Sequence, residues 1–402
     1  MRLLLQKNSL QEKMAQLGLL SVICLGISIP LSTSLTSIFT ILTSLLWLVS
    51  GKFKETYASF MNNPVIRAAL LLFILFIIGV TYSTAGFNEA LHGLNTYRKL
   101  FLIVIFSSFV KTRQSQQWAI YAFFIGCFIL LGTSCISDWK IIPTFTLPSN
   151  TLYSHVTHSI YMAFFAFWLA VKFMENSRLV RAAYGILFCL TTYNIFFVVN
   201  GRSGYVLFVF LMIFFLYHYF DKGKFIFSLL LVGLLLLSSL FFANKFSERL
   251  LATKQNFYSY QQKRNNHTSI GQRLDFAKTS LRLVMKHPLA GYGTGSFARE
   301  YKKLSQQIGT YATDNPHNEY LSITVQLGAI GLIMFLYLLT TQWWYSKNMK
   351  YESLLAQGFV LTIVTGALMN SMLLDAGEGH FFAYCSAILF ANINTDNTDS
   401  SK

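Results

Sequence analysis

The sequence predicts an all-α polytopic membrane protein, and two observations lead to this fold class. Of its 402 residues, 54% are apolar and only 12% are charged, whereas a soluble domain carries roughly a quarter charged residues. The apolar residues also gather into long runs, and a helix needs about 20 such residues to cross a bilayer. We therefore expect a bundle of membrane-spanning helices.

About twelve apolar runs are predicted to be membrane-spanning helices. They lie at residues 15–33, 36–50, 65–83, 98–110, 117–136, 157–172, 181–199, 204–219, 225–243, 320–340, 355–373 and 381–393. The run 225–243 contains no charged residue, whereas 98–110 and 381–393 are short. A second run follows the first at once, so the N-terminal run is read as an uncleaved span and not as a signal peptide.

Lysine and arginine concentrate in the short loops on one side of these runs, whereas the opposite short loops hold little beyond Lys140 and Arg202. Cytoplasmic loops carry the excess of basic residues, so both termini are predicted to be cytoplasmic. The chain then divides into nine spans (1–243), one long loop on the opposite, non-cytoplasmic side (244–320), three spans (321–393) and a cytoplasmic tail (394–402). Within the loop, apolar periodicity predicts helices at 270–286 and 297–307.

Two arginines are candidates for binding phosphate. Arg202 lies in the tight connection Asn-Gly-Arg-Ser-Gly before a span, and Arg273 lies on the predicted loop helix. A guanidinium group presents a planar fork that matches phosphate oxygens. The alternatives are that Arg202 reaches to lipid headgroups and that Arg273 is simply solvated. Arg98 and Lys99 begin a span at the same face, where they bind substrate or only anchor the helix.

His317 is the candidate base, since an imidazole takes up a proton near neutral pH. Glu319 could orient it or act itself, and a structural histidine is the alternative. Asp375, Glu378 and His380 form a further polar cluster between the last two spans, which could line the cavity or be a solvated turn.

Other patterns argue against particular chemistry. Three glycines (Gly291, Gly293 and Gly295) predict a turn, because a phosphate cradle joins a strand to a helix. Gly328 and Gly331 are expected to let spans pack closely. We find no Walker motif, no metal-ligand spacing and no nucleic-acid module, so we expect no cofactor, no metal site and no nucleic-acid partner. The positive charge is suited to membrane lipids or phosphate-bearing substrates.

The order of these parts resembles the O-antigen ligases, within the larger group that includes O-antigen polymerases and bacterial O-oligosaccharyltransferases. The resemblance rests on a many-span chain with one long late loop and on four motifs. These are Asn-Gly-Arg202-Ser-Gly, Gly271-Gln-Arg273, the segment from His287 to Phe297, and Pro316-His317-Asn318-Glu319-Tyr320 leading into Leu327-Gly328-Ala329-Ile330-Gly331-Leu332.

The resemblance implies a GT-C-like fold and a metal-independent, inverting glycosyltransferase of the bacterial inner membrane. The donor would be a glycan on undecaprenyl diphosphate, and the acceptor the lipid A–core oligosaccharide. Arg202 and Arg273 would hold the diphosphate, and His317 would stand beside the acceptor hydroxyl. The weaker substrate-binding candidates are Lys99 (or Arg98), Asn318, Glu319 and Tyr320.

Three alternatives stay open. An O-antigen polymerase and a protein O-oligosaccharyltransferase would use the same donor with a different acceptor. A transporter of lipid-linked glycans would carry its functional charges at mid-membrane, whereas the candidates here gather at one face.

Overall fold

The structure is a computed structural model that describes residues 2–51, 53–142, 147, 151–152, 154–199, 201–226 and 269–391. All regular elements in these ranges are helical. They are α1 (Arg2–Ser28), α2 (Thr33–Ser50), α3 (Phe53–Asn62), α4 (Pro64–Thr81), α5 (Phe87–Tyr97), α6 (Lys99–Ser107), α7 (Arg113–Asp138), α8 (His155–Glu175), α9 (Arg178–Tyr193), the π-helix η2 (Asn194–Val198), α10 (Arg202–Tyr219), α13 (Ser269–Lys286), α14 (Phe297–Ile308), α15 (Glu319–Lys347), α16 (Ser353–Met369) and α17 (Ala376–Leu389).

Seven stretches within the described residues are long and apolar enough to cross a membrane. They are Thr33–Ser50, Pro64–Thr81, Arg113–Asp138, His155–Glu175, Arg178–Val198, Arg202–Tyr219 and Glu319–Lys347. The predicted run 98–110 contains only the nine-residue α6, and almost all of 225–243 lies outside the described residues. The chain is therefore an all-α protein of multi-pass membrane character, and the count of twelve spans stays a prediction.

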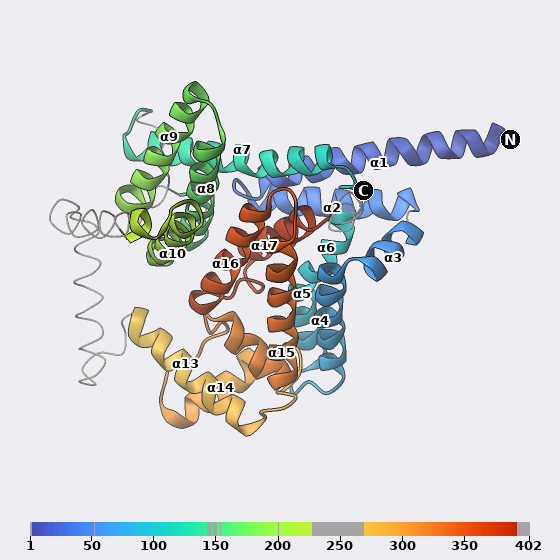
Figure 1. Ribbon diagram of the computed structural model, residues 1–402. Helices are drawn as coiled ribbons and strands as arrows, with labels where there is room; N and C mark the ends of the chain where they lie inside the picture. The colour runs from blue at the N-terminus through green and yellow to red at the C-terminus, as the bar shows by residue number, and fades with distance from the viewer. Residues whose placement is uncertain are drawn as a thin grey trace.

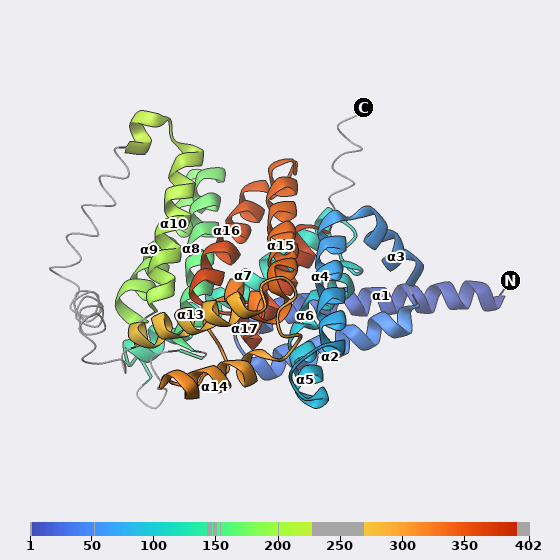
Figure 2. The ribbon, with the colours of Figure 1, turned by 90° about the horizontal axis from the view of Figure 1, so that it is seen from below.

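The helices run in two main directions. The hairpin of α1 and α2 lies side by side with α7 across the molecule, whereas α4 and α15 pack together at a steep angle to it (Figure 1). Helices α13 and α14, joined by a turn, lie together at one edge of the bundle, opposite the turn that joins α15 to α16 (Figure 2). The two helices predicted for the long loop are therefore confirmed, and both cover the same end of the bundle.

Polar residues that precede the apolar runs fix where several helices begin. Asn63 accepts hydrogen bonds from the backbone N–H groups of Val65 and Ile66, with Pro64 in the first helical position. Ser154 and Asn318 cap α8 and α15 in the same manner. Such caps satisfy N–H groups that the first helical turn leaves free.

An aromatic core holds α7, α8, α16 and α17 together. The ring of Phe381 on α17 lies 5.3 Å from Phe123 on α7, 5.5 Å from Phe164 on α8 and 5.6 Å from Phe359 on α16, centroid to centroid. Tilted and edge-to-face pairs at these distances are favourable beyond the area they bury. This core fixes α17, whose first turn carries part of the site described below.

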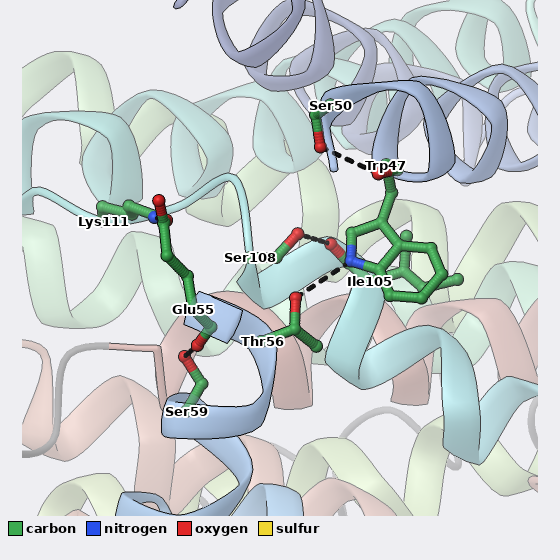
Figure 3. A network of polar contacts seen from close by, with 8 residues as sticks. All are labelled: Trp47, Ser50, Glu55, Thr56, Ser59, Ile105, Ser108 and Lys111. Atoms are coloured by element: carbon green, nitrogen blue, oxygen red, sulfur yellow. Dashed lines mark hydrogen bonds and ion pairs between the residues drawn. The ribbon is translucent and has the colours of Figure 1, made fainter. Parts of the chain in front are cut away.

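A polar network joins α3 to α2 and α6 (Figure 3). The indole N–H of Trp47 donates to the Thr56 hydroxyl at 3.0 Å, and Lys111 forms an ion pair with Glu55. The side chains of this pair are about half exposed, 46% for Lys111 and 50% for Glu55. The network therefore fastens α3 to the bundle at a surface that water reaches.

Candidate active site

Two glycines place Arg202 at the first turn of α10. A Cβ atom on Gly201 or Gly204 would collide with the Ser159 side chain of α8, and one on Gly201 would also approach the His155 carbonyl. Only glycine lets the start of α10 approach α8 this closely, which explains why glycines flank the arginine in the sequence. Arg202 itself is half-buried and adds its charge to the positive end of the α10 dipole.

Arg273 approaches Arg202 from the loop helix α13. Burial lowers the pKa of Arg273 from its ordinary value, and the charge of Arg202 lowers it further. Each effect disfavours a second positive charge at this place. The two guanidinium groups, drawn from segments 71 positions apart in the printed sequence, therefore form a half-buried cationic pair that an anion between them would stabilise.

His317 lies on the same side of α13 as Arg273. The imidazole of His317 faces the Phe276 ring at 6.2 Å between centroids, with 29° between the planes. Phe276 follows Arg273 by three residues, so both side chains lie on one face of the helix. Arg202 and Arg273 are thus close enough for their charges to interact, and His317 lies beside Phe276, one helical turn along α13 from Arg273.

The backbone of His317 adopts a left-handed conformation, with a φ of 51°, which is uncommon for a residue other than glycine. Its N–H donates to Asn315 Oδ1 at 2.8 Å, and Ser371 Oγ donates to the same oxygen at 2.7 Å. The span was predicted to begin at residue 320, and α15 begins at Glu319 with Asn318 as its cap. His317 therefore lies in a short, strained turn above the helix.

The imidazole of His317 also contacts Asn370. Its Oδ1 lies 3.4 Å from His317 Nδ1, and its Nδ2 donates to Glu378 Oε1 at 3.2 Å. Thr157 donates its hydroxyl to the same Glu378 oxygen at 2.8 Å. A chain of polar contacts thus runs from α8 through α17 to His317.

Glu378 and His380 lie within α17, although the sequence predicted this span to begin at residue 381. Both side chains are almost fully buried. The interpretation as a solvated turn is therefore wrong for these two residues. Asp375, which precedes α17, is more accessible; burial raises its pKa, and the nearby charges of His317 and Lys99 oppose that rise.

Lys99 holds the segment that carries Asp375. Its Nζ donates to the carbonyl oxygens of Leu373, Leu374 and Asp375 at 2.9, 3.1 and 2.7 Å, and the residue is only 4% exposed. Arg98, by contrast, is exposed, and its Nη1 donates to the carbonyl of Asn95. The three donor positions of the Lys99 ammonium are thus all occupied by backbone oxygens.

Glu319 holds the same segment from α15. Its Oε2 accepts the N–H of Leu373 at 2.7 Å, and the side chain is fully buried. Tyr320 donates its hydroxyl to the Val364 carbonyl, and Asn318 Nδ2 donates to the Leu368 carbonyl. The residues that follow His317 thus connect α15 to α16 and to the turn after it.

Helix α15 is broken at Gly328, whose φ of 64° and ψ of −159° are non-helical. The turn 287–295 fills the break. Tyr292 N–H donates to the Val325 carbonyl and Gly293 N–H to the Gln326 carbonyl, while Ala329 N–H donates to the Pro288 carbonyl. The break leaves these groups without helical partners, and an unpaired backbone group is costly in a membrane protein.

The glycines of this turn all have positive φ values, which confirms the predicted turn: 67° at Gly291, 88° at Gly293 and 77° at Gly295. A Cβ atom at Gly293 would collide with the backbone of Ser83 and Gly79. Gly328 was expected only to pack spans closely, but it also breaks the helix. The turn therefore fixes the half-helix that begins just after His317.

Asn315 and Asn370 are the site residues that sequence reasoning missed. Each stands beside a residue that ends a helix or turns the chain, Pro316 in one case and Ser371 in the other, so both read as ordinary turn residues. One usable signal is that Asn315 lies close in sequence to the candidate residue His317, and Asn370 lies close to the candidate residue Asp375.

The fold and the site together define a multi-pass α-helical membrane protein with a cationic, histidine-bearing site at one end of its bundle. Residues 185–336, which include Arg202, Arg273 and His317, match the family model described as O-Antigen ligase. A protein of Haemophilus influenzae (strain Rd), described as an uncharacterized protein, is 24% identical over 322 residues, which are 77% of this chain and 79% of the relative. At the family level, the match supports an enzyme of lipid-linked glycan transfer.

Proposed function

We propose that the protein is an O-antigen ligase of the bacterial inner membrane. It transfers a glycan from undecaprenyl diphosphate to a sugar hydroxyl of the lipid A–core oligosaccharide, with inversion at the anomeric carbon and without a metal ion. The observation that carries the proposal is the half-buried pair of Arg202 and Arg273 beside His317. The family match over residues 185–336 supports it at a coarser level.

The cationic pair suits the leaving group of this reaction. As the bond between the anomeric carbon and the diphosphate oxygen breaks, its electron pair stays on the oxygen and negative charge grows on the diphosphate. Fixed cations aimed at that growing charge lower the barrier, because they bind the transition state more strongly than the ground state. The guanidinium forks of Arg202 and Arg273 take this role.

His317 suits the attacking side. Its imidazole accepts the proton of the acceptor hydroxyl while the hydroxyl oxygen forms its bond to the anomeric carbon. The products are the glycosylated acceptor and undecaprenyl diphosphate, and the proton leaves the imidazole to solvent. The reaction needs no ATP, because the bond to the diphosphate already stores the required free energy.

The arrangement of the bundle supports a site that faces the periplasm. Lys347 ends α15 and Lys350 lies in the turn to α16, and this turn lies at the edge opposite α13 and α14 (Figure 2). Basic residues in a short loop favour the cytoplasmic side. We therefore propose that both termini are cytoplasmic and that α13, with Arg273, covers the periplasmic end.

Transfer by the purified protein tests the proposal. It is given a lipid-linked glycan with or without lipid A–core, and the products are separated on gels. We expect Arg273→Ala to lower the transfer rate by about 100-fold or more, as for the loss of one donor to a developing charge, and His317→Ala by a similar factor. Arg282→Ala is the matched control, because Arg282 is exposed on the same helix.

Two results would contradict the proposal. Wild-type rates in both the Arg273 and the His317 variants would remove the site from the reaction. Glycan chains that lengthen on the polyprenyl carrier when lipid A–core is left out would identify a polymerase.

A further variant tests the role of the guanidinium fork. Retained activity in Arg273→Lys would show that charge alone, without the planar fork, is sufficient at this position.

A further inference from the structure

We propose that Asn370, itself oriented by Glu378, is a positioning residue that holds His317 with its proton on Nδ1 and its lone pair on Nε2. The inference rests on the proposed function, since it concerns how His317 acts as the base. It assigns a role to two residues of the α16–α17 region, which lies beyond the segment 185–336 that matches the family.

The donor and acceptor roles along the polar chain can be assigned in order. Glu378 Oε1 accepts a hydrogen bond from the Thr157 hydroxyl. It therefore presents a lone pair, and no proton, to Asn370. The group of Asn370 that faces it must then be the amide nitrogen, which donates at 3.2 Å. The amide oxygen of Asn370 is left to face His317 Nδ1, 3.4 Å away.

An amide oxygen can only accept a hydrogen bond, which determines the tautomer of the imidazole. The contact is satisfied when Nδ1 carries the proton, and a neutral imidazole with a proton on Nδ1 has its free lone pair on Nε2. Nε2 is therefore the atom that takes the proton of the acceptor hydroxyl. After the transfer both nitrogens carry protons, and the contact from Nδ1 to Asn370 is kept.

The backbone of His317 is held as firmly as its ring. Asn315 Oδ1 accepts its N–H, and Asn315 Nδ2 donates to Asp375 Oδ1 at 3.2 Å. A left-handed conformation at a residue with a side chain is strained and persists only where the surroundings hold it. The α16–α17 region holds the residue at two points, through Asn315 and through Asn370.

The charged groups around the imidazole come from four helices and one turn. They are Asp375 from the turn before α17, Glu378 behind Asn370, Arg273 on the face of α13 that carries Phe276, and Lys99 and Glu319 beneath that turn. Asp375 interacts with His317 by charge, so it stabilises the imidazolium that forms during transfer. Asn370 is neutral, and its effect on the reaction is therefore one of orientation.

Two substitutions at Asn370 separate orientation from folding. Asn370→Leu has a similar size and no acceptor, so either tautomer becomes available; we expect kcat to fall by about 10-fold or more with the KM for donor unchanged. Asn370→Asp keeps an acceptor toward Nδ1, so most of kcat should return. Its added carboxylate favours the imidazolium, which moves the acidic limb of the pH profile to higher pH.

Nitrogen-15 spectra of the histidines give a readout that a merely structural role would not move. The signal assigned to His317, by its loss in His317→Gln, should show a protonated Nδ1 in the wild type and a mixture of tautomers in Asn370→Leu. Asn348→Leu is the matched control, because it makes the same substitution at an exposed asparagine at the other end of α15, where Asn348 Nδ2 donates only to the Trp344 carbonyl. It should keep both the wild-type kcat and the wild-type tautomer.

The outcomes distinguish this inference from the proposed function. Wild-type kcat and an unchanged tautomer in Asn370→Leu, with an inactive His317→Ala, would overturn the role of Asn370 alone. Full activity in His317→Ala would overturn the proposed base and this inference with it. A protonated Nε2 in the wild-type spectrum would contradict the assignment of the lone pair directly.

Discussion

Two polar networks in this protein use the same kinds of groups in opposite surroundings. One joins α3 to α2 and α6, and its ion pair between Lys111 and Glu55 is about half exposed. The other joins α6, α8, α15 and α17 beneath His317, where Lys99 is 4% exposed and Glu319 fully buried. Lys99 opens the nine-residue α6 and Lys111 follows its end, so this one short helix separates the buried network from the exposed one.

The difference shows what a buried network requires. Exposed charges keep their water, so an exposed pair can form and break at little cost and contributes roughly 0–1 kcal/mol. Buried charges lose their water and need several well-placed partners in return. Those partners here are largely backbone groups, the carbonyls that Lys99 binds and the N–H that Glu319 accepts. The backbone must therefore be held rigidly, and the glycine turn supplies part of that rigidity.

The strongest test of this difference is Gly293→Ala. A methyl group there meets the backbone of Ser83 and Gly79, and a φ of 88° is one that residues with side chains rarely adopt. We expect the turn to leave the break in α15, with little folded protein recovered and no transfer activity. Size-exclusion profiles and thermal melting in detergent measure the outcome.

Gly309→Ala is the matched control, because it separates the backbone effect from the collision. Gly309 has a φ of 70° and nothing within 4 Å of an added Cβ atom. It should cost only about 1 kcal/mol, the usual penalty for a left-handed residue with a side chain. Equal effects of the two substitutions would mean that the close packing of the turn is unimportant.

The next effect in size is that of Lys99→Met. It removes the donor to three carbonyl oxygens and the cation beside Glu319 and Asp375. We expect the free energy of unfolding to fall by about 3 kcal/mol or more, as when one partner of a buried charged network is removed. Thermal melting in detergent, with kcat and KM measured on the folded fraction, checks this. A stable variant with only a raised KM for the donor would instead support Lys99 as a ligand of the diphosphate.

The smallest effect is expected from Lys111→Met, the same substitution in the exposed network. Its ion pair with Glu55 is screened by salt and shared with water, so the free energy of unfolding should change by about 0.5 kcal/mol or less. The difference from the wild type should shrink further in high salt. A loss as large as that of Lys99→Met would break the contrast between the two networks.

The sequence predicted the loop helices closely. The expected ranges were 270–286 and 297–307, and the helices run from Ser269 to Lys286 and from Phe297 to Ile308. Both have strong apolar periodicity, and the first ends shortly before a proline. The start of α17 was predicted five residues late, because Ala-Gly-Glu-Gly-His reads as a polar turn. Lys99 and Thr157 hold this segment through hydrogen bonds from distant parts of the chain, which no local pattern reveals.

The prediction of the site from the sequence is limited in the same way, because local patterns do not reveal contacts between distant segments. Arg202, Arg273 and His317 could be proposed one by one from residue type and motif, but their meeting depends on how α10, α13 and α15 pack. Asn370 has no distinguishing pattern, since an asparagine after an apolar run is an ordinary turn residue. The break at Gly328 was hidden for a similar reason, because its effect arises only when the distant turn 287–295 supplies the missing hydrogen bonds.

The break in α15 has a consequence for how the protein is made. The first half-helix, Glu319–Leu327, is about 14 Å long, roughly half of the hydrocarbon thickness, and it carries the carbonyls that Tyr292 and Gly293 satisfy. Residues 287–295 precede α15 in the chain, so they leave the ribosome first. We expect this turn to cross the bilayer before α15 is inserted. The carbonyl groups of the first half-helix then meet their hydrogen-bond donors as soon as that half-helix enters the membrane.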